Sequence, residues 1–224
     1  MKKLFIPLLF VTLLPVSYSC SVGKMAGYVL NERDAEAAIR QLLQIGTQDG
    51  VLTGAFSKEM IMTTLFPEPV RKTLNTLNQL GVTNEVDRFT TTLSTAAEKT
   101  AANSVPIFVS SISNMRLTDA IRIIKSDGTA ATDYLRATTG DSIRRAITPV
   151  VQAALEEYKL NEQWNSIIKP IGGSKLNLNL SNLMAGLVSE VMFRKIEEKE
   201  RQIRTDAAAR TTPLLQKVFS RKWN

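Results

Sequence analysis

The stretch IRRAITPVVQAALEEY, Ile143–Tyr158, has the clearest pattern in the chain. The apolar and aromatic residues on one face of a helix through this stretch are Ile143, Ile147, Val150, Val151, Ala154, Leu155 and Tyr158. They recur at spacings of three and four residues, the period of an α-helix with one apolar face. Pro149 lies inside the pattern, so we expect it to kink or split the helix. The stretch predicts a long helix that packs against other helices.

Helical spacing continues on both sides of this stretch. The expected helices lie roughly at residues 31–46, 67–81, 83–97, 106–112 and 117–125 before it, and at 161–171, 183–204 and 206–219 after it. Gly46 is expected to end the first of them, and Pro106 to begin a short separate one. Residues 175–180 alternate leucine with polar residues but have no partner strand, so we interpret them as an extended linker. The sequence predicts one compact all-α domain, residues 31–220, of about eight to ten helices.

The N-terminus has the pattern of an export signal. Two lysines at positions 2 and 3 precede an almost wholly apolar segment, Leu4–Val16, which is too short to span a bilayer. Small residues at Ser17 and Ser19 favour cleavage before Cys20. We therefore expect residues 1–19 to be a lipoprotein-type signal peptide, followed by a tether over residues 20–30.

Cys20 is the only cysteine in the chain. At the first mature position it matches a bacterial lipoprotein signal, which makes it the predicted lipidation site and membrane anchor. Ser17 departs from that pattern, because an aliphatic residue is expected three positions before the cysteine. A free thiol at the mature N-terminus is the alternative. Ser21 after the cysteine indicates sorting to the periplasmic side of the outer membrane.

The amino-acid composition excludes several kinds of catalytic and metal-binding site. The chain has no histidine, which removes Ser-His-Asp catalysis and the commonest zinc ligand. We expect no catalytic residue, cofactor or metal. The net charge of +7 is compatible with polyanions, but the basic residues are scattered and aromatic residues make up 6%. Without a recognisable motif, nucleic acid is not an expected partner.

Residues 126–141 form the densest polar stretch. The candidate ligand-binding residues are Asp127, Asp133, Tyr134, Arg136, Thr138, Thr139, Asp141 and Arg144. The aspartates have the chemistry to surround a cation, and the arginines to bind an anionic group. The alternative is structural: Thr129 caps one helix, Thr138 or Thr139 caps the next, and the charged residues link helices. Glu197, Glu198 and Glu200 alternate with lysines, which predicts a solvated, salt-bridged helix face.

Several segments resemble one family. They are Phe66–Val70 with Leu74, Ala96–Glu98, Val105–Phe108, Asp119–Ala120, Asp133–Thr139, Ile147–Val151 and Leu214–Phe219. Together they resemble the bacterial DUF4197 family, exported proteins of unassigned function, over residues 31–219. The resemblance implies a single all-helical domain in the cell envelope and supplies no catalytic residue. The family usually has Thr or Ser as a helix cap where this chain has Arg116, so that cap must be made differently.

These observations favour a non-catalytic, lipid-anchored binding or scaffold module with a membrane contact through Cys20 and an envelope protein as partner. One alternative is a carrier of a small apolar or lipid-like molecule held between helices. A second alternative is an enzyme that uses carboxylates, which requires a cleft containing Asp127, Asp133 or Asp141.

Overall fold

The structure is a computed structural model that describes residues 28–48, 55–79, 81, 83–168 and 179–223. Over these residues it contains nine α-helices, one π-helical turn and no strand, which confirms the all-α prediction. The elements are α1 (Glu32–Gln48), α2 (Lys58–Met60), η1 (Ile61–Leu65), α3 (Glu68–Gln79), α4 (Thr83–Asn114), α5 (Ala120–Lys125), α6 (Ala130–Glu157), α7 (Leu160–Ile168), α8 (Leu180–Thr205) and α9 (Pro213–Phe219).

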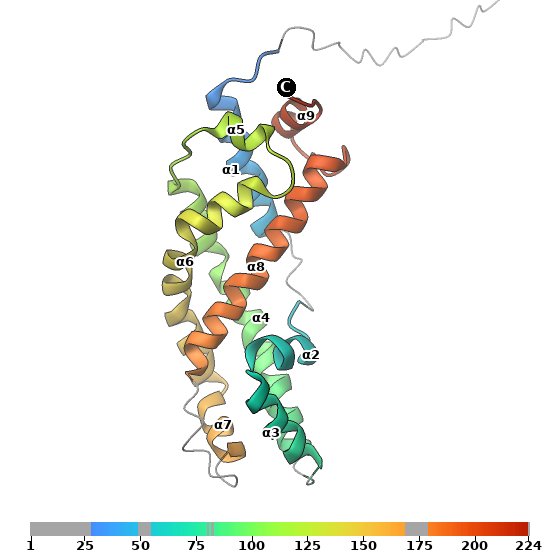
Figure 1. The fold of residues 1–224 in the computed structure, drawn as a ribbon. Coiled ribbons are helices and arrows are strands. Elements are labelled where there is room, and N and C mark those ends of the chain that lie inside the picture. The colour runs from blue at the N-terminus through green and yellow to red at the C-terminus, as the bar shows by residue number, and fades with distance from the viewer. Residues whose placement is uncertain (1–27, 49–54, 80, 82, 169–178, 224) are drawn as a thin grey trace, which may run out of the picture.

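The molecule is elongated, and its three long helices, α4, α6 and α8, run along its length (Figure 1). At one end, α1 packs against α4, α5, α8 and α9. We call this the near end, because residue 28 and the C-terminal helix both lie there. At the other end, α3 and α7 pack against α4, and η1 contacts α4 and α8. We call this the far end.

One apolar core runs through both ends. In its middle the ring of Phe108 on α4 meets that of Phe193 on α8 edge to face, with centroids 5.3 Å apart. At the far end Trp164 of α7 lies against Phe66 and Phe89, each with a centroid distance of 5.6 Å. Aromatic pairs in this range add to the stabilisation from burial. Among the described helices, none is long and apolar enough to cross a bilayer.

Two helices continue through a proline. The prediction of separate helices at 83–97 and 106–112 is wrong, because α4 includes Pro106 as one helix. Likewise α6 runs through Pro149 without being split, and it begins at Ala130 rather than at Ile143. Both prolines face solvent, where water can hydrogen-bond the carbonyls that lose a partner. Burial of the opposite helix face therefore offsets the missing hydrogen bond.

Gly46 does not end the first helix. It lies inside α1, where a Cβ atom would approach the Cα of Ile196 on α8 to 3.0 Å. The glycine therefore permits close contact between two helices rather than a turn.

Two further boundaries differ from the prediction. The last helix, α9, begins at Pro213, and Thr212 caps it by accepting a hydrogen bond from the Leu215 amide. Residues 206–212 are not helical, contrary to prediction. Residues 175–178 of the expected linker lie outside the described part of the chain, whereas Leu180 is already helical.

Candidate functional site

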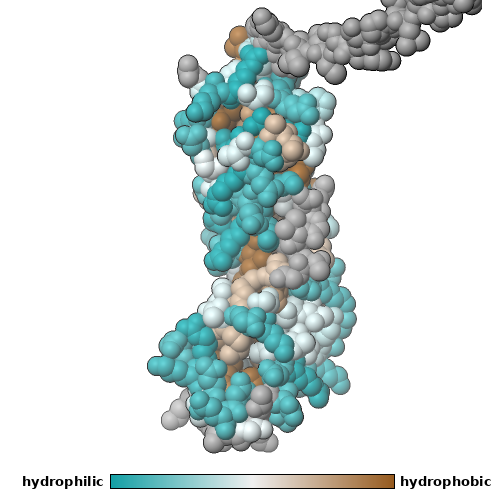
Figure 2. Space-filling model, turned by 90° about the vertical axis from the view of Figure 1, so that its right-hand side faces the viewer, coloured by the Kyte–Doolittle hydropathy of each residue, from teal (hydrophilic) through white to brown (hydrophobic). Residues whose placement is uncertain are grey.

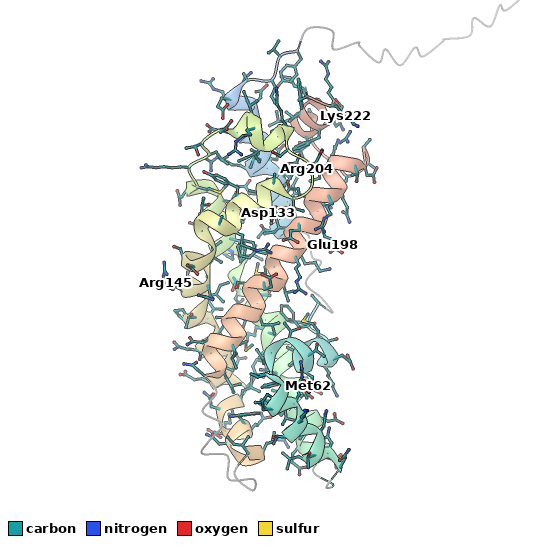
Figure 3. The ribbon with its side chains drawn as sticks, viewed as in Figure 1. Met62, Asp133, Arg145, Glu198, Arg204 and Lys222 are labelled. Carbon is teal, nitrogen blue, oxygen red and sulfur yellow. The ribbon has the colours of Figure 1, made fainter. Side chains whose placement is uncertain are left out.

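The three aspartates of the polar stretch do not converge. Asp127 is exposed in the turn between α5 and α6. Asp133, exposed in the first turn of α6, accepts a hydrogen bond from the hydroxyl of Thr129 at 3.0 Å (Figure 3). Asp141 is exposed two turns further along and pairs with Arg144 at 3.2 Å. The described residues contain no group of three or more acidic or thiol side chains that could hold a metal ion.

Tyr134, Thr138 and Thr139 make local contacts. The Tyr134 hydroxyl donates to the carbonyl of Arg116 at 2.7 Å. The hydroxyls of Thr138 and Thr139 donate to the carbonyls of Tyr134 and Leu135, one turn earlier in α6. Neither threonine caps a helix, because α6 has already begun at Ala130. Thr129 does occupy the N-cap position, although its side chain makes no capping hydrogen bond.

Arg136 links α6 to α8. Its Nη1 lies 2.7 Å from a carboxylate oxygen of Glu197, and its Nη2 lies 3.5 Å from Glu190. The guanidinium also lies over the ring of Phe193, 4.9 Å from the centroid. This agrees with the structural alternative for Arg136: its charge is directed at carboxylates of the neighbouring helix. Arg144 does not join that network, since it pairs with Asp141 on its own helix.

A groove between α6 and α8 brings several of the candidates together. One hollow, of about 340 Å³, is bordered by Arg136, Ala137, Thr138, Gly140, Asp141, Ser142, Arg144, Gly186, Ser189, Glu190 and Phe193. A second, of about 350 Å³, is bordered by Arg144, Arg145, Thr148, Asn182 and Ala185. Arg144 borders both, so the hollows adjoin, and a Cβ atom at Gly186 would meet only open space. This α6–α8 groove is open to solvent and lined mainly by charged and hydroxyl groups.

Of the charged residues that the structure describes, the most completely buried is one that the sequence pattern placed on the surface. Glu200 has 0% exposure, so the prediction of a solvated face is wrong for this position. Its carboxylate accepts hydrogen bonds from the Ala131 and Thr132 amides, the Thr132 hydroxyl and Arg204 Nε, at 2.6–3.0 Å. Glu200 thereby caps the first turn of α6. Its spacing from Ile196 and Ile203, four and three residues, is the signal that places it on the buried stripe.

Arg204 completes this buried pair (Figure 3). Its guanidinium donates to the carbonyls of Ile123, Ile124 and Ser126 at 2.8–3.2 Å, at the C-terminal end of α5. A cation is favourable at a helix C-terminus and an anion at a helix N-terminus. One ion pair on α8 therefore holds the end of α5 and the start of α6 on either side of the turn at Gly128, whose φ is +75°.

The start of α5 is also held from outside. Glu32 of α1 accepts a hydrogen bond from the Ala120 amide at 2.5 Å. Asp119, in the left-handed conformation with φ +66°, accepts one from the Arg122 amide at 3.3 Å. These two carboxylates supply the capping that Arg116 does not.

The first described residues contact the C-terminal segment through hydrogen bonds and aromatic packing. Tyr28 donates its hydroxyl proton to Asp34, which also accepts a hydrogen bond from Lys217 Nζ at 3.0 Å. The ring of Trp223 meets that of Tyr28 edge to face, with centroids 5.8 Å apart. Lys217 Nζ lies 3.8 Å from the centre of the Tyr28 ring. We call Tyr28, Asp34, Lys217 and Trp223 the clasp. Two of its members, Tyr28 and Trp223, lie outside the range 31–220 expected for the domain.

The clasp makes a prediction for the titration of Tyr28. Burial, and then the hydrogen bond to Asp34, raise the pKa of Tyr28 from 10.0 to about 12, while the same bond and Lys217 lower the pKa of Asp34. The clasp therefore contributes fully below pH 10, down to the acidic range in which Asp34 is protonated, and the contribution of the Tyr28 hydroxyl is lost as the pH rises to about 12. The difference between phenolate absorbance titrations of the wild type and Tyr28→Phe should have its midpoint at about 12. A midpoint near 10.0 would show that the Tyr28 hydroxyl is not hydrogen-bonded to Asp34. The same titrations of the urea-unfolded proteins give the reference midpoint.

The comparison with known families gives a match over nearly the whole described chain. Residues 29–220 match the family described as "Protein of unknown function (DUF4197)". No curated protein and no solved structure matches the chain. The matched range covers the helices that form the core, the α6–α8 groove and the Glu200–Arg204 pair. The chain therefore belongs to the DUF4197 family.

Proposed function

We propose that this protein is a lipid-anchored, non-catalytic binding or scaffold module on the periplasmic side of the outer membrane. The observation that carries the proposal is the clasp. It holds residue 28, the start of the described chain, against the C-terminal segment at one end of an elongated domain. An anchor at Cys20 would then leave the far end and the α6–α8 groove directed away from the membrane.

The distribution of polar groups supports a binding role over a catalytic one. Asp127, Asp133 and Asp141, the candidates for carboxylate chemistry, are all exposed, and only Asp141 borders the groove. The buried carboxylate of Glu200 is fully engaged in capping α6. The α6–α8 groove, with charged and hydroxyl groups along both helices, suits the polar surface of a partner protein better than an apolar ligand.

Mass spectrometry of the protein purified from its own envelope tests the proposal. Under denaturing conditions we expect a chain that begins at Cys20 and carries the added mass of acyl chains. Under native conditions we expect either a bound protein partner or the domain alone. Cys20→Ser is the control: this variant should be folded, free of acyl chains and released into the periplasmic extract at high salt.

The outcomes are distinct. A mature chain with an unmodified Cys20 would contradict the lipid anchor. A small apolar molecule released on denaturation would contradict the scaffold role and favour the carrier. A folded variant that stays in the membrane fraction when Cys20 is replaced would show that something other than a lipid holds the protein there.

A further inference from the structure

Among the described residues, one large hydrophobic side chain is exposed, and it lies at the near end. Val29 is 78% exposed, while its neighbour Leu30 is 7% exposed and belongs to the core. Tyr28, on the other side, lies in the clasp. The chain is thus fixed on both sides of Val29, and its side chain projects from an ordered surface. In Figure 2 a small brown area lies at the near-end tip, and further brown and tan areas lie between teal ones along the middle of the same face.

Aromatic and basic groups surround this position. Trp223 packs on Tyr28, and its indole nitrogen donates to the carbonyl of Val218 at 2.7 Å. Arg33 lies in the first turn of α1, one turn beyond Val29, and is exposed. Lys222, next to Trp223, is also exposed at this end (Figure 3). Within the described part of the chain, neither Arg33 nor Lys222 makes an ion pair. An exposed aliphatic group, aromatic rings and exposed cations are the combination that binds an anionic lipid surface.

The acidic residues nearest to Arg33 in the sequence are Glu32, Asp34 and Glu36. Asp34 is shared between Tyr28 and Lys217, and Glu32 accepts the hydrogen bond of the Ala120 amide on α5. Lys217 offsets the charge of Asp34, whereas Glu32 and Glu36 keep theirs and weaken the attraction of Arg33 for anions. Residues 213–223 contain no acidic residue, so no acidic neighbour in its own segment offsets Lys222. At physiological ionic strength such charges act over about 8 Å, so they matter only if this end is held close to its target.

A lipid anchor at Cys20 would hold the near end close to the membrane, because the tether is short. Seven residues, 21–27, separate Cys20 from Tyr28. Even fully extended, the chain from Cys20 to Tyr28 spans at most about 28 Å. An anchored Cys20 would keep the near end at a high effective concentration beside the bilayer, where weak contacts are sufficient.

We propose that Val29, Arg33, Trp223 and Lys222 form a membrane-contact surface that rests on the anionic phospholipids of the leaflet holding the anchor. The inference rests on the proposed lipid anchor for its geometry, but the surface itself is a property of the folded domain. Val29 enters the headgroup region, Arg33 and Lys222 lie at lipid phosphates, and the long axis of the molecule points away from the membrane.

Vesicle sedimentation with the Cys20→Ser protein tests the surface without an anchor. The vesicles contain phosphatidylglycerol and phosphatidylethanolamine in equal parts, and in the neutral reference phosphatidylcholine replaces phosphatidylglycerol. We expect binding to the anionic vesicles that weakens with added salt. The pair Arg33→Glu and Lys222→Glu should lower the affinity about tenfold or more. Val29→Ser should lower it without any change in charge.

A matched pair at the far end controls for total charge. Lys72→Glu on α3 and Arg88→Glu on α4 change the net charge by the same amount at exposed positions. These variants should bind like the parent. The proposal would be overturned if the near-end and far-end pairs lost affinity equally. It would also be overturned if the Cys20→Ser protein bound neutral and anionic vesicles equally, or did not bind anionic vesicles at all. Circular dichroism confirms that each variant is folded. Because the test uses unacylated protein, its failure is separate from a failure of lipidation, which the mass of Cys20 decides.

Discussion

Replacing Glu200 by alanine is expected to lower the free energy of unfolding by about 3–5 kcal/mol, the range for removing one partner of a buried ion pair. The loss has two parts. Arg204, whose side chain is 11% exposed, would keep its charge in the interior without its carboxylate. The amides of Ala131 and Thr132, in the first turn of α6, would lose their acceptor.

Urea unfolding followed by circular dichroism measures this effect, and the same helix offers a control. Glu198→Ala removes an exposed carboxylate that pairs with Lys195 at 3.0 Å, and it should cost less than about 1 kcal/mol. The loss in the free energy of unfolding for Glu200→Gln should lie between those of the two alanine variants. The glutamine amide keeps one acceptor oxygen but turns its NH₂ group toward donors. Equal stabilities of the Glu198 and Glu200 variants would show that the buried pair does not hold α5 and α6.

The second large effect is expected for Trp164→Ala, which removes the centre of the far-end aromatic cluster. Its ring is 4% exposed and stacks on Phe66 with an interplanar angle of 9°. Through Phe66 and Phe89 it joins α7 to the segment before α3 and to α4. Truncating a buried tryptophan typically costs about 3–5 kcal/mol, from lost burial and from the cavity that remains.

Amide hydrogen exchange distinguishes a local from a global loss. The far-end helices contact α4, while α1, α5 and α9 pack at the other end. We therefore expect protection to fall most in α3 and α7 and least around the clasp. Trp164→Phe, which keeps an aromatic ring in the cluster, should lose much less. An equal fall at both ends in Trp164→Ala would mean that the elongated domain unfolds as one unit.

Local patterns predicted the helices well but not where they end. The apolar period around Ile147 and the start of the first helix near residue 31, where the Asn31 side chain accepts a hydrogen bond from the Asp34 amide at 2.9 Å, depend only on residues within a turn or two. Pro106 and Gly46 were assigned as helix boundaries because each opposes a helix locally. Packing reversed both assignments: the proline faces solvent, and the glycine is where α1 meets α8.

The sequence also predicted only part of the candidate site. Arg136, Thr138, Asp141 and Arg144 do border one groove, and their grouping was predicted because they lie close together in the sequence. Asp127 does not border it because it lies in the turn before α6, and Asp133, Tyr134 and Thr139 do not because they make local contacts. Gly186, Ser189 and Glu190 on α8 form the other wall, and nothing in residues 126–141 indicates which helix would lie opposite.

The sequence alone determined that the domain is helical, which faces of its helices are apolar, and that Cys20 is the predicted anchor. These follow from short-range spacing and from the order of residues at the N-terminus. The tertiary structure decided that Glu200 is buried, that Tyr28 and Trp223 meet, and that Val29 remains exposed at the same end. Each of these depends on segments far apart in the chain, such as Thr132 with Glu200. A local pattern gives a residue's place on its own helix, whereas burial and pairing depend on which other helix lies against that face.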